Sequence, residues 1–105
     1  MKPEYDESVD ALYIKFSSKP AYFTVELSPR IAVDVNRDGR TVGVELLDAS
    51  RVVSDLFQKT VSRGQVKRIL CTVSEKDAVY LNFELEGARA SLAVPLAYKS
   101  PVLEA

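Results

Sequence analysis

The stretch IAVDVNRDGRTVGVEL, residues 31–46, decides the fold of this chain. Larger apolar residues occupy every second position on both sides of Asp38-Gly39, which is the period of a half-buried β-strand. An Asp-Gly pair favours a tight hairpin turn, because both residues tolerate the positive φ that such a turn requires. Pairing Val35 with Val42, and Val33 with Val44, puts the apolar side chains on one face. The stretch therefore predicts an antiparallel hairpin with one buried side.

The alternation continues toward the N-terminus. A short strand is expected over Lys2–Tyr5, a second over Ala11–Phe16 and a third from Phe23 to Leu27. Because a slip of one residue would reverse the buried face, the apolar positions also set the register. The pairs expected on this basis are Ile14 with Val25, Phe16 with Phe23, Phe23 with Val35, Val25 with Val33 and Leu27 with Ile31.

One helix is predicted over residues 51–63. Asp48 or Ser50 can accept hydrogen bonds from the free N–H groups at its start, and Gly64 can end it in the left-handed conformation. Its apolar stripe recurs at helical spacing and is expected to pack on the sheet. The stripe consists of Val52, Val53, Leu56, Phe57 and Val61.

Further strands are predicted within residues 66–97. Two alternating segments flank Glu86-Gly87, and pairing Phe83 with Ala90 and Leu81 with Leu92 leaves that dipeptide as the turn. From Ala97 onward the pattern fades, which predicts a loose tail or an arm on a neighbouring subunit.

These elements predict a single α+β domain over residues 1–105. A twisted antiparallel meander sheet of about seven strands carries one helix on its apolar face. The meander occupies residues 1–51, the helix residues 51–63 and the additional strands residues 66–97. Unpaired strand edges at the N-terminal strand and near the C-terminus favour self-association, so a homodimer is expected.

Composition excludes several classes of protein. The formal net charge is −1, whereas a dedicated nucleic-acid binder usually has a strong basic excess. The chain has no histidine, which excludes Ser-His-Asp and Cys-His nucleophilic systems. Its one cysteine, Cys71, cannot form an internal disulfide and is expected to be a small buried hydrophobe. No apolar run approaches the length of a membrane span, so a small soluble cytoplasmic protein is expected. No cofactor is expected.

An ordered set of short motifs runs from Glu4 to about Arg51. They are Tyr5-Asp6, Asp10-Ala11-Leu12-Tyr13-Ile14, Val33-Asp34, Asp38-Gly39-Arg40 and the stretch from Val42 to Ser50. This set resembles the YuzE-like family of small proteins, a domain of unknown function. The resemblance implies a small sheet-plus-helix domain without a known reaction. Toxin-like proteins encoded beside some relatives imply an antitoxin-like or partner-binding role.

One local pattern fits a calcium loop. Asp34, Asn36, Asp38 and Glu45, with Gly39 at the bend, match the spacing D-x-N-x-D-G-x₅-E. Such a loop lies between two helices, whereas this stretch is predicted to pair as a hairpin. The alternative interpretation is a turn stabilised by Asn and Asp side chains.

The second candidate is the polar face of the predicted sheet. Carboxylates among tyrosines could form a general acid/base pair, a half-solvated surface or a protein interface, where tyrosine is enriched. The residues expected on this face are Tyr13, Lys15, Tyr22, Thr24, Glu26, Asp34, Thr41 and Glu45.

The sequence favours a non-enzymatic protein-interaction module. A carboxylate-based metal-binding protein or metal-dependent hydrolase using Asp34, Asp38 and Glu45 remains the alternative. No residue is assigned a catalytic, cofactor-binding or metal-ligating role.

Overall fold

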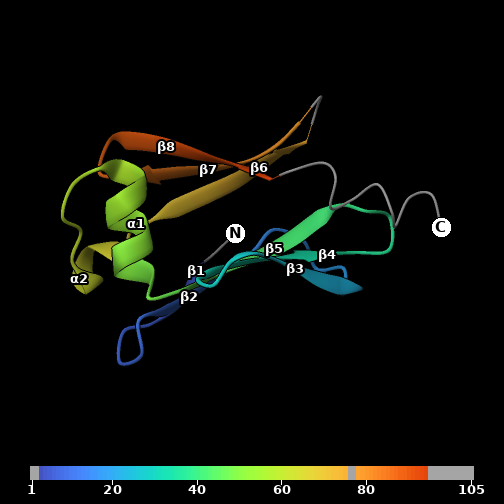
Figure 1. Cartoon of the computed structure of the whole chain (residues 1–105), viewed down its shortest axis with the longest axis horizontal. Coiled ribbons are helices and arrows are strands. Elements are labelled where there is room, and N and C mark those ends of the chain that lie inside the picture. The colour runs from blue at the N-terminus through green and yellow to red at the C-terminus, as the bar shows by residue number, and fades with distance from the viewer. Residues whose placement is uncertain (1–2, 76–77, 95–105) are drawn as a thin grey trace.

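A computed structural model describes residues 3–75 and 78–94 of the chain. Eight strands form two antiparallel sheets, and two helices lie between the sheets at one end of the molecule (Figure 1). The predicted α+β class is therefore confirmed. The prediction of about seven strands in one meander is approximate, because the strands divide into two layers.

Sheet A contains five strands in the order β1-β2-β5-β4-β3. Their bounds are Pro3–Asp6 for β1, Ala11–Lys15 for β2, Phe23–Ser28 for β3, Ile31–Val35 for β4 and Thr41–Leu47 for β5. Strands β1 and β3 lie at its edges.

The predicted pairing of β3, β4 and β5 is largely confirmed. Phe23 lies opposite Val35, Val25 opposite Val33, and Val33 opposite Val44. Irregularities shift both ends by one residue: Ile31 pairs with Ser28 instead of Leu27, and Val35 pairs with Thr41 instead of Val42. An extra residue in one strand, as in a β-bulge, produces this shift, and alternation alone cannot locate it.

The predicted hairpin between β2 and β3 is wrong. Ile14 pairs with Val44, not with Val25, because β2 lies between β1 and β5. Phe16 donates its backbone N–H to the carbonyl oxygen of Val42 and does not pair with Phe23. Either partner would leave the apolar side of β2 facing the core, so the alternation fixes the face of the strand but not its neighbour.

Sheet B contains β6 (Leu70–Glu75), β7 (Val79–Leu85) and β8 (Ala88–Val94), in that order. The predicted pairs of Phe83 with Ala90 and Leu81 with Leu92 are confirmed. Glu86 and Gly87 both have positive φ, as a two-residue hairpin turn requires. The predicted tail from Ala97 onward lies outside the described residues.

The helical region differs from the predicted single helix over residues 51–63. Helix α1 spans Ala49–Phe57, and a short helix α2 spans Arg63–Val66. Gln58, with φ of 55°, ends α1 in the left-handed conformation that was predicted for Gly64. Gly64 lies instead within α2, which begins with a capping box formed by Ser62 and Gln65.

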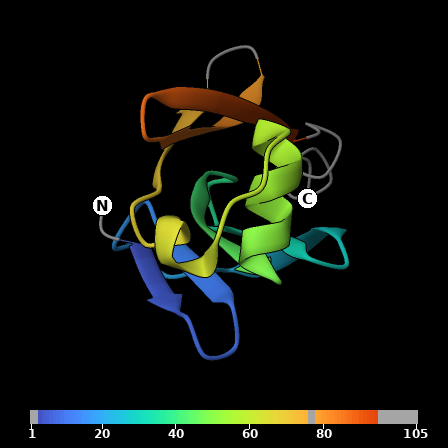
Figure 2. The same cartoon turned by 90° about the vertical axis from the view of Figure 1, so that its left-hand side faces the viewer.

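The core lies between the two sheets. The inner face of sheet A contributes Leu12, Ile14, Val33, Val44 and Leu46, and sheet B contributes Val79, Leu81, Phe83 and Leu85. Helix α1 closes one end of this core (Figure 2) with Val52 and Val53, both buried. Full burial of each such side chain contributes about 1.5–3 kcal/mol. Two apolar sheet faces covering each other explain why a second sheet forms in place of one wide meander.

Glu75 connects the two sheets away from the helices. Its carboxylate accepts a hydrogen bond of 2.8 Å from the backbone N–H of Thr41 and lies 3.7 Å from Arg40. The end of β6 is thereby fixed to the start of β5.

In the described part of the chain, none of the helices is long and apolar enough to cross a membrane.

Candidate functional site

The residues of the calcium-loop pattern are engaged in separate interactions. The side-chain oxygen of Asn36 accepts hydrogen bonds of 3.0 Å from the backbone N–H groups of Asp38 and Arg40. Asn36 is buried and therefore shapes the β4–β5 turn from within. Asp38 lies 3.8 Å from Lys19 on the surface, whereas Asp34 and Glu45 belong to the strands. Within residues 3–75 and 78–94, no group of three or more Cys, Asp or Glu side chains is arranged to hold a metal ion.

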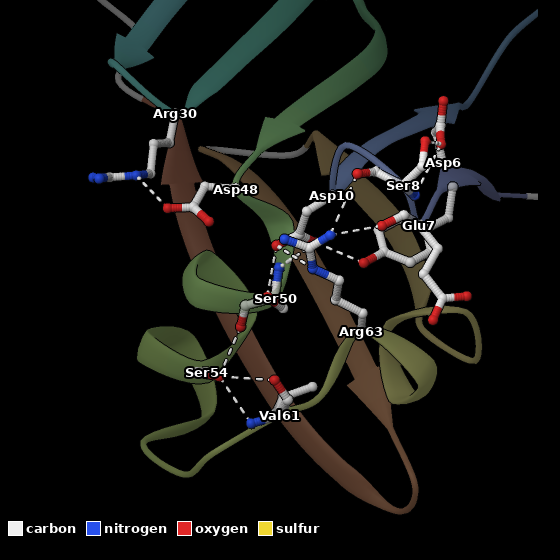
Figure 3. Close-up of polar contacts among 11 residues, drawn as sticks. Asp6, Glu7, Ser8, Asp10, Arg30, Asp48, Ser50, Ser54, Val61 and Arg63 are labelled. Carbon is white, nitrogen blue, oxygen red and sulfur yellow. Dashed lines mark hydrogen bonds and ion pairs between the residues drawn. The ribbon is translucent and has the colours of Figure 1, made fainter.

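A second polar cluster surrounds Asp10, in the turn between β1 and β2 (Figure 3). The Asp10 carboxylate accepts hydrogen bonds of 3.0 Å from the backbone N–H of Ser50 and 2.6 Å from the Ser50 hydroxyl. The backbone carbonyl of Asp10 accepts from Ala49 N–H at 2.8 Å. Asp10 thus caps the start of α1 from a distant part of the chain. Asp48 occupies the N-cap position, as predicted, but its side chain makes no cap hydrogen bond, so that part of the prediction is wrong.

The same carboxylate also holds β1 and α2. The Tyr5 hydroxyl donates a hydrogen bond of 2.6 Å to Asp10, and the Arg63 guanidinium lies 3.7 Å away. Burial alone would raise the pKa of Asp10, but hydrogen bonds from Ser50 and Tyr5 and the charge of Arg63 outweigh it and lower the pKa. Because Asp10 is 2 % exposed and both of its carboxylate oxygens already accept hydrogen bonds, we interpret this cluster as structural.

The outer face of sheet A, which points away from sheet B, is the candidate functional site. No described element covers it (Figures 1 and 2). The cross-strand register places one row of residues directly across all five strands. The row consists of Glu4, Tyr13, Glu45, Ala32 and Glu26, in that order.

Tyr13, on β2, is held in a fixed orientation on this face. Its hydroxyl donates a hydrogen bond of 2.9 Å to Asp34, which also accepts one of 2.6 Å from Thr24. The ring lies over Gly43, where any Cβ would overlap the phenol. Partial burial, the hydrogen bond to Asp34 and the nearby carboxylates raise the pKa of Tyr13 to about 12. The tyrosine therefore stays neutral and well oriented at physiological pH.

A hollow of about 390 Å³ opens beside Tyr13. Because the ring leans toward Gly43, the neighbouring surface over Ala11 is left open. Glu4, Asp6 and Glu45 are among the residues that line the hollow, and their register places them on the outer face.

Charge is distributed unevenly over the molecule. Within the described part of the chain, the carboxylates without an ion pair are those of Glu4, Asp6, Glu26, Asp34, Glu45 and Asp55. All except Asp55, which lies on α1, project from the outer face of sheet A. By contrast, the basic residues Arg63, Lys67 and Arg68 near α2 each lie within ion-pair distance of a carboxylate.

The predicted polar face was partly right. Tyr13, Lys15, Thr24, Glu26, Asp34 and Glu45 lie on it, as their strand register requires. Lys15 is in the row that contains Asp34 and Thr24, and it is the one basic side chain among these residues. Thr41 does not, because the irregularity in β5 places it opposite the buried Val35. Tyr22 precedes β3, and its ring packs against the Arg37 guanidinium at 4.5 Å. The face also includes Glu4 and Asp6, which could have been identified from the alternation within β1 once its pairing with β2 was recognised.

Cys71 is buried, as predicted, and burial raises the pKa of its thiol to about 12. A thiol with this pKa is a poor nucleophile near neutral pH, since the thiolate is the reactive form.

The extent of sheet A coincides with a family match. Residues 2–50 match a family described as "Protein of unknown function (DUF2283)". The match covers the strands of sheet A and ends in the first turn of α1. It therefore includes the outer face and Tyr5, Asp10 and Ser50 of the Asp10 cluster, but neither Arg63 nor sheet B. The predicted resemblance of the N-terminal half to a domain of unknown function is confirmed to this extent. Neither the curated proteins nor the solved structures gave a significant match.

Proposed function

We propose that this protein is a non-enzymatic interaction module that binds a protein partner through the outer face of sheet A. The observation that carries the proposal is the gathering of unpaired carboxylates around the fixed ring of Tyr13 on an uncovered sheet face. Like charges placed together destabilise the folded chain, so their segregation on one face favours a role in binding.

Tyr13 provides an aromatic ring of the kind that is common in protein interfaces. A tyrosine ring buries a large apolar area at a low cost in side-chain entropy, and tyrosine is enriched at interface centres. The hydrogen bond to Asp34 orders this ring before any partner arrives, which reduces the entropy lost on binding.

The candidate reactive groups favour binding over catalysis. The carboxylate of Asp10 already accepts three hydrogen bonds, and its lowered pKa makes it a weak base. The raised pKa of Cys71 opposes nucleophilic attack.

A pull-down of the tagged protein from its own cell lysate tests this proposal. The expected result is a stoichiometric protein partner that is retained by the unaltered protein, with and without EDTA. The partner should be lost from the double variant Glu26→Lys/Glu45→Lys, because both side chains are exposed on the outer face.

The matched control alters the outer face of sheet B. Leu70 and Tyr80 are exposed there, and Leu70→Gln/Tyr80→Gln should retain the partner. Loss of the partner from this variant, with retention by the outer-face variant, would contradict the proposal. A partner retained only in the absence of EDTA would instead support a metal-dependent protein.

Self-association remains a prediction. Strands β1 and β3 present unpaired edges in sheet A, and light scattering after gel filtration would measure whether the chain is a homodimer.

A further inference from the structure

We infer that the partner docks a basic segment on the outer face of sheet A, with an arginine side chain inserted into the hollow beside Tyr13. This inference rests on the proposed function and specifies the chemistry of the partner. It follows from the complementarity between an acidic, uncovered sheet face and a cationic occupant.

The charge of the face sets the sign of the occupant. Glu4, Glu45 and Glu26 lie in one row, separated in turn by Tyr13 and by Ala32. Strands are about 4.8 Å apart, so successive glutamates are separated by roughly 10 Å. None of the three has a hydrogen-bond or ion-pair partner in the part of the chain that the structure describes. A segment carrying several cations would neutralise them together.

The hollow favours arginine over lysine as the anchor. Acidic residues line it from two strands, Glu4 and Asp6 from β1 and Glu45 from β5, and Tyr13 on the strand between them also lines it. A guanidinium group can bond a carboxylate through two parallel N–H groups while it stacks on an aromatic ring. An ammonium group is a compact point charge that cannot do both. This protein already contains the stacking part of such a contact, since Arg37 lies over the ring of Tyr22.

Small side chains on the outer face allow a partner segment to come close to the backbone of the sheet. Ala32 lies between Glu45 and Glu26, and Ala11 forms part of the wall of the hollow, so small side chains leave room between the acids. The occupant can therefore contact the sheet surface between the glutamates while its cations reach them.

Fluorescence anisotropy with a labelled arginine-rich peptide tests the inference. Three probes of equal length are compared: the arginine peptide, its lysine counterpart, and its citrulline counterpart, which keeps the shape but lacks the charge. The arginine peptide should bind several-fold more tightly than the lysine peptide, and the citrulline peptide should not bind. Affinity should fall when salt is raised to about 0.5 M, because exposed charges are then screened.

Variants of the unpaired carboxylates locate the site. Glu4→Gln/Glu45→Gln should weaken binding by about tenfold, since each exposed charge pair contributes a few-fold. The control is Asp55→Asn combined with Asp48→Asn, which removes the same charge away from the outer face. This control should change affinity by less than about twofold.

Each opposite outcome overturns the inference. If the control variant weakens peptide binding as much as Glu4→Gln/Glu45→Gln, the peptide is attracted to an acidic protein in general. If the lysine peptide binds as tightly as the arginine peptide, the hollow does not select arginine. A lysate partner that depends on the outer face but proves acidic or insensitive to salt would overturn this inference alone. The proposed interaction through that face would then stand.

Discussion

At the scale of the residue, Asp10 joins three parts of the chain. Its carboxylate bonds to Tyr5 on β1 and to Ser50 at the start of α1, and it lies beside Arg63 at the start of α2. Asp10 adopts a left-handed conformation with φ of 55°, which is uncommon outside Gly but favoured by Asp and Asn. The fold therefore accepts local strain to bring one acid to a helix end.

Asp10→Asn should lower the free energy of unfolding by about 2 kcal/mol at neutral pH. The substitution removes the buried negative charge that caps α1 and pairs with Arg63. The pKa of Asp10 is lower in the folded than in the unfolded state, so its stabilisation is complete above the unfolded pKa of about 4. It is lost as the pH falls from there through the folded pKa. Urea unfolding at several pH values should show the difference between the two proteins shrinking below about pH 4.

Asp48→Asn is the matched control for this prediction. Asp48 occupies the N-cap position without a side-chain cap and forms an exposed ion pair with Arg30. Its replacement should cost less than about 0.5 kcal/mol. A larger effect from Asp48 than from Asp10 would show that the local residue caps α1 after all.

Gly43→Ala should displace the Tyr13 ring, because a Cβ at this position overlaps the phenol. The hydrogen bond to Asp34 would be lost, at a cost of about 1 kcal/mol. The pKa of Tyr13 should fall from about 12 toward the ordinary value near 10. Ultraviolet titration against Tyr13→Phe identifies this residue, and an unchanged pKa would contradict the described packing.

At the scale of the element, backbone conformation decides where helices and hairpins end. Gln58 ends α1 with positive φ although glycine is available at position 64. The N–H groups of Gln58 and Lys59 bond to carbonyls in the last turn, which completes the helix end. Ser54 then bonds the backbone N–H of Val61 and returns the chain toward α2.

The same substitution at two glycines should have opposite effects. Gly87 has φ of 85°, so Gly87→Ala should destabilise the protein by about 1 kcal/mol although space is free around it. Gly64 lies inside α2, so Gly64→Ala should stabilise by up to about 1 kcal/mol. Thermal melting measures both, and destabilisation by Gly64→Ala would indicate that this residue ends a helix.

At the scale of the whole molecule, acidic and basic side chains form ion pairs around the helices, whereas the acidic side chains on the outer face of sheet A have no ion pair within the residues that the structure describes. The ion pairs near α2 join it to the β1–β2 turn and to the β7–β8 turn. The acids of the outer face repel one another instead. Such an arrangement is typical of a surface on which binding takes precedence over stability.

Glu4→Gln/Glu45→Gln should therefore raise the melting temperature by about 2 °C or more at low salt, since like charges are removed. The gain should vanish at about 1 M salt, where charges farther apart than roughly 3 Å are screened. Calorimetry at both salt concentrations measures this difference. A lower melting temperature at low salt would show that these acids stabilise the sheet.

The sequence predicted local features more reliably than distant contacts. Alternation identified the buried faces of β4, β5, β7 and β8, and Glu86-Gly87 was correctly predicted as a turn. The neighbour of β2 was not predictable, because β3 and β5 offer the same alternation of apolar side chains. Of the candidate site, Tyr13 and Asp34 were correctly placed on one face, whereas Glu4 and Asp6 required the pairing of β1.

The sequence by itself determined the antiparallel strands, the side of each strand that is buried and the presence of a helical segment after sheet A. These properties depend on neighbours along the chain, because strand and helix periods are local. Only the tertiary structure decided the division into two sheets, the capping of α1 by Asp10 and the collection of unpaired acids on one face. These features join residues far apart in sequence, and many pairings satisfy the same local pattern until the layers pack and close the core.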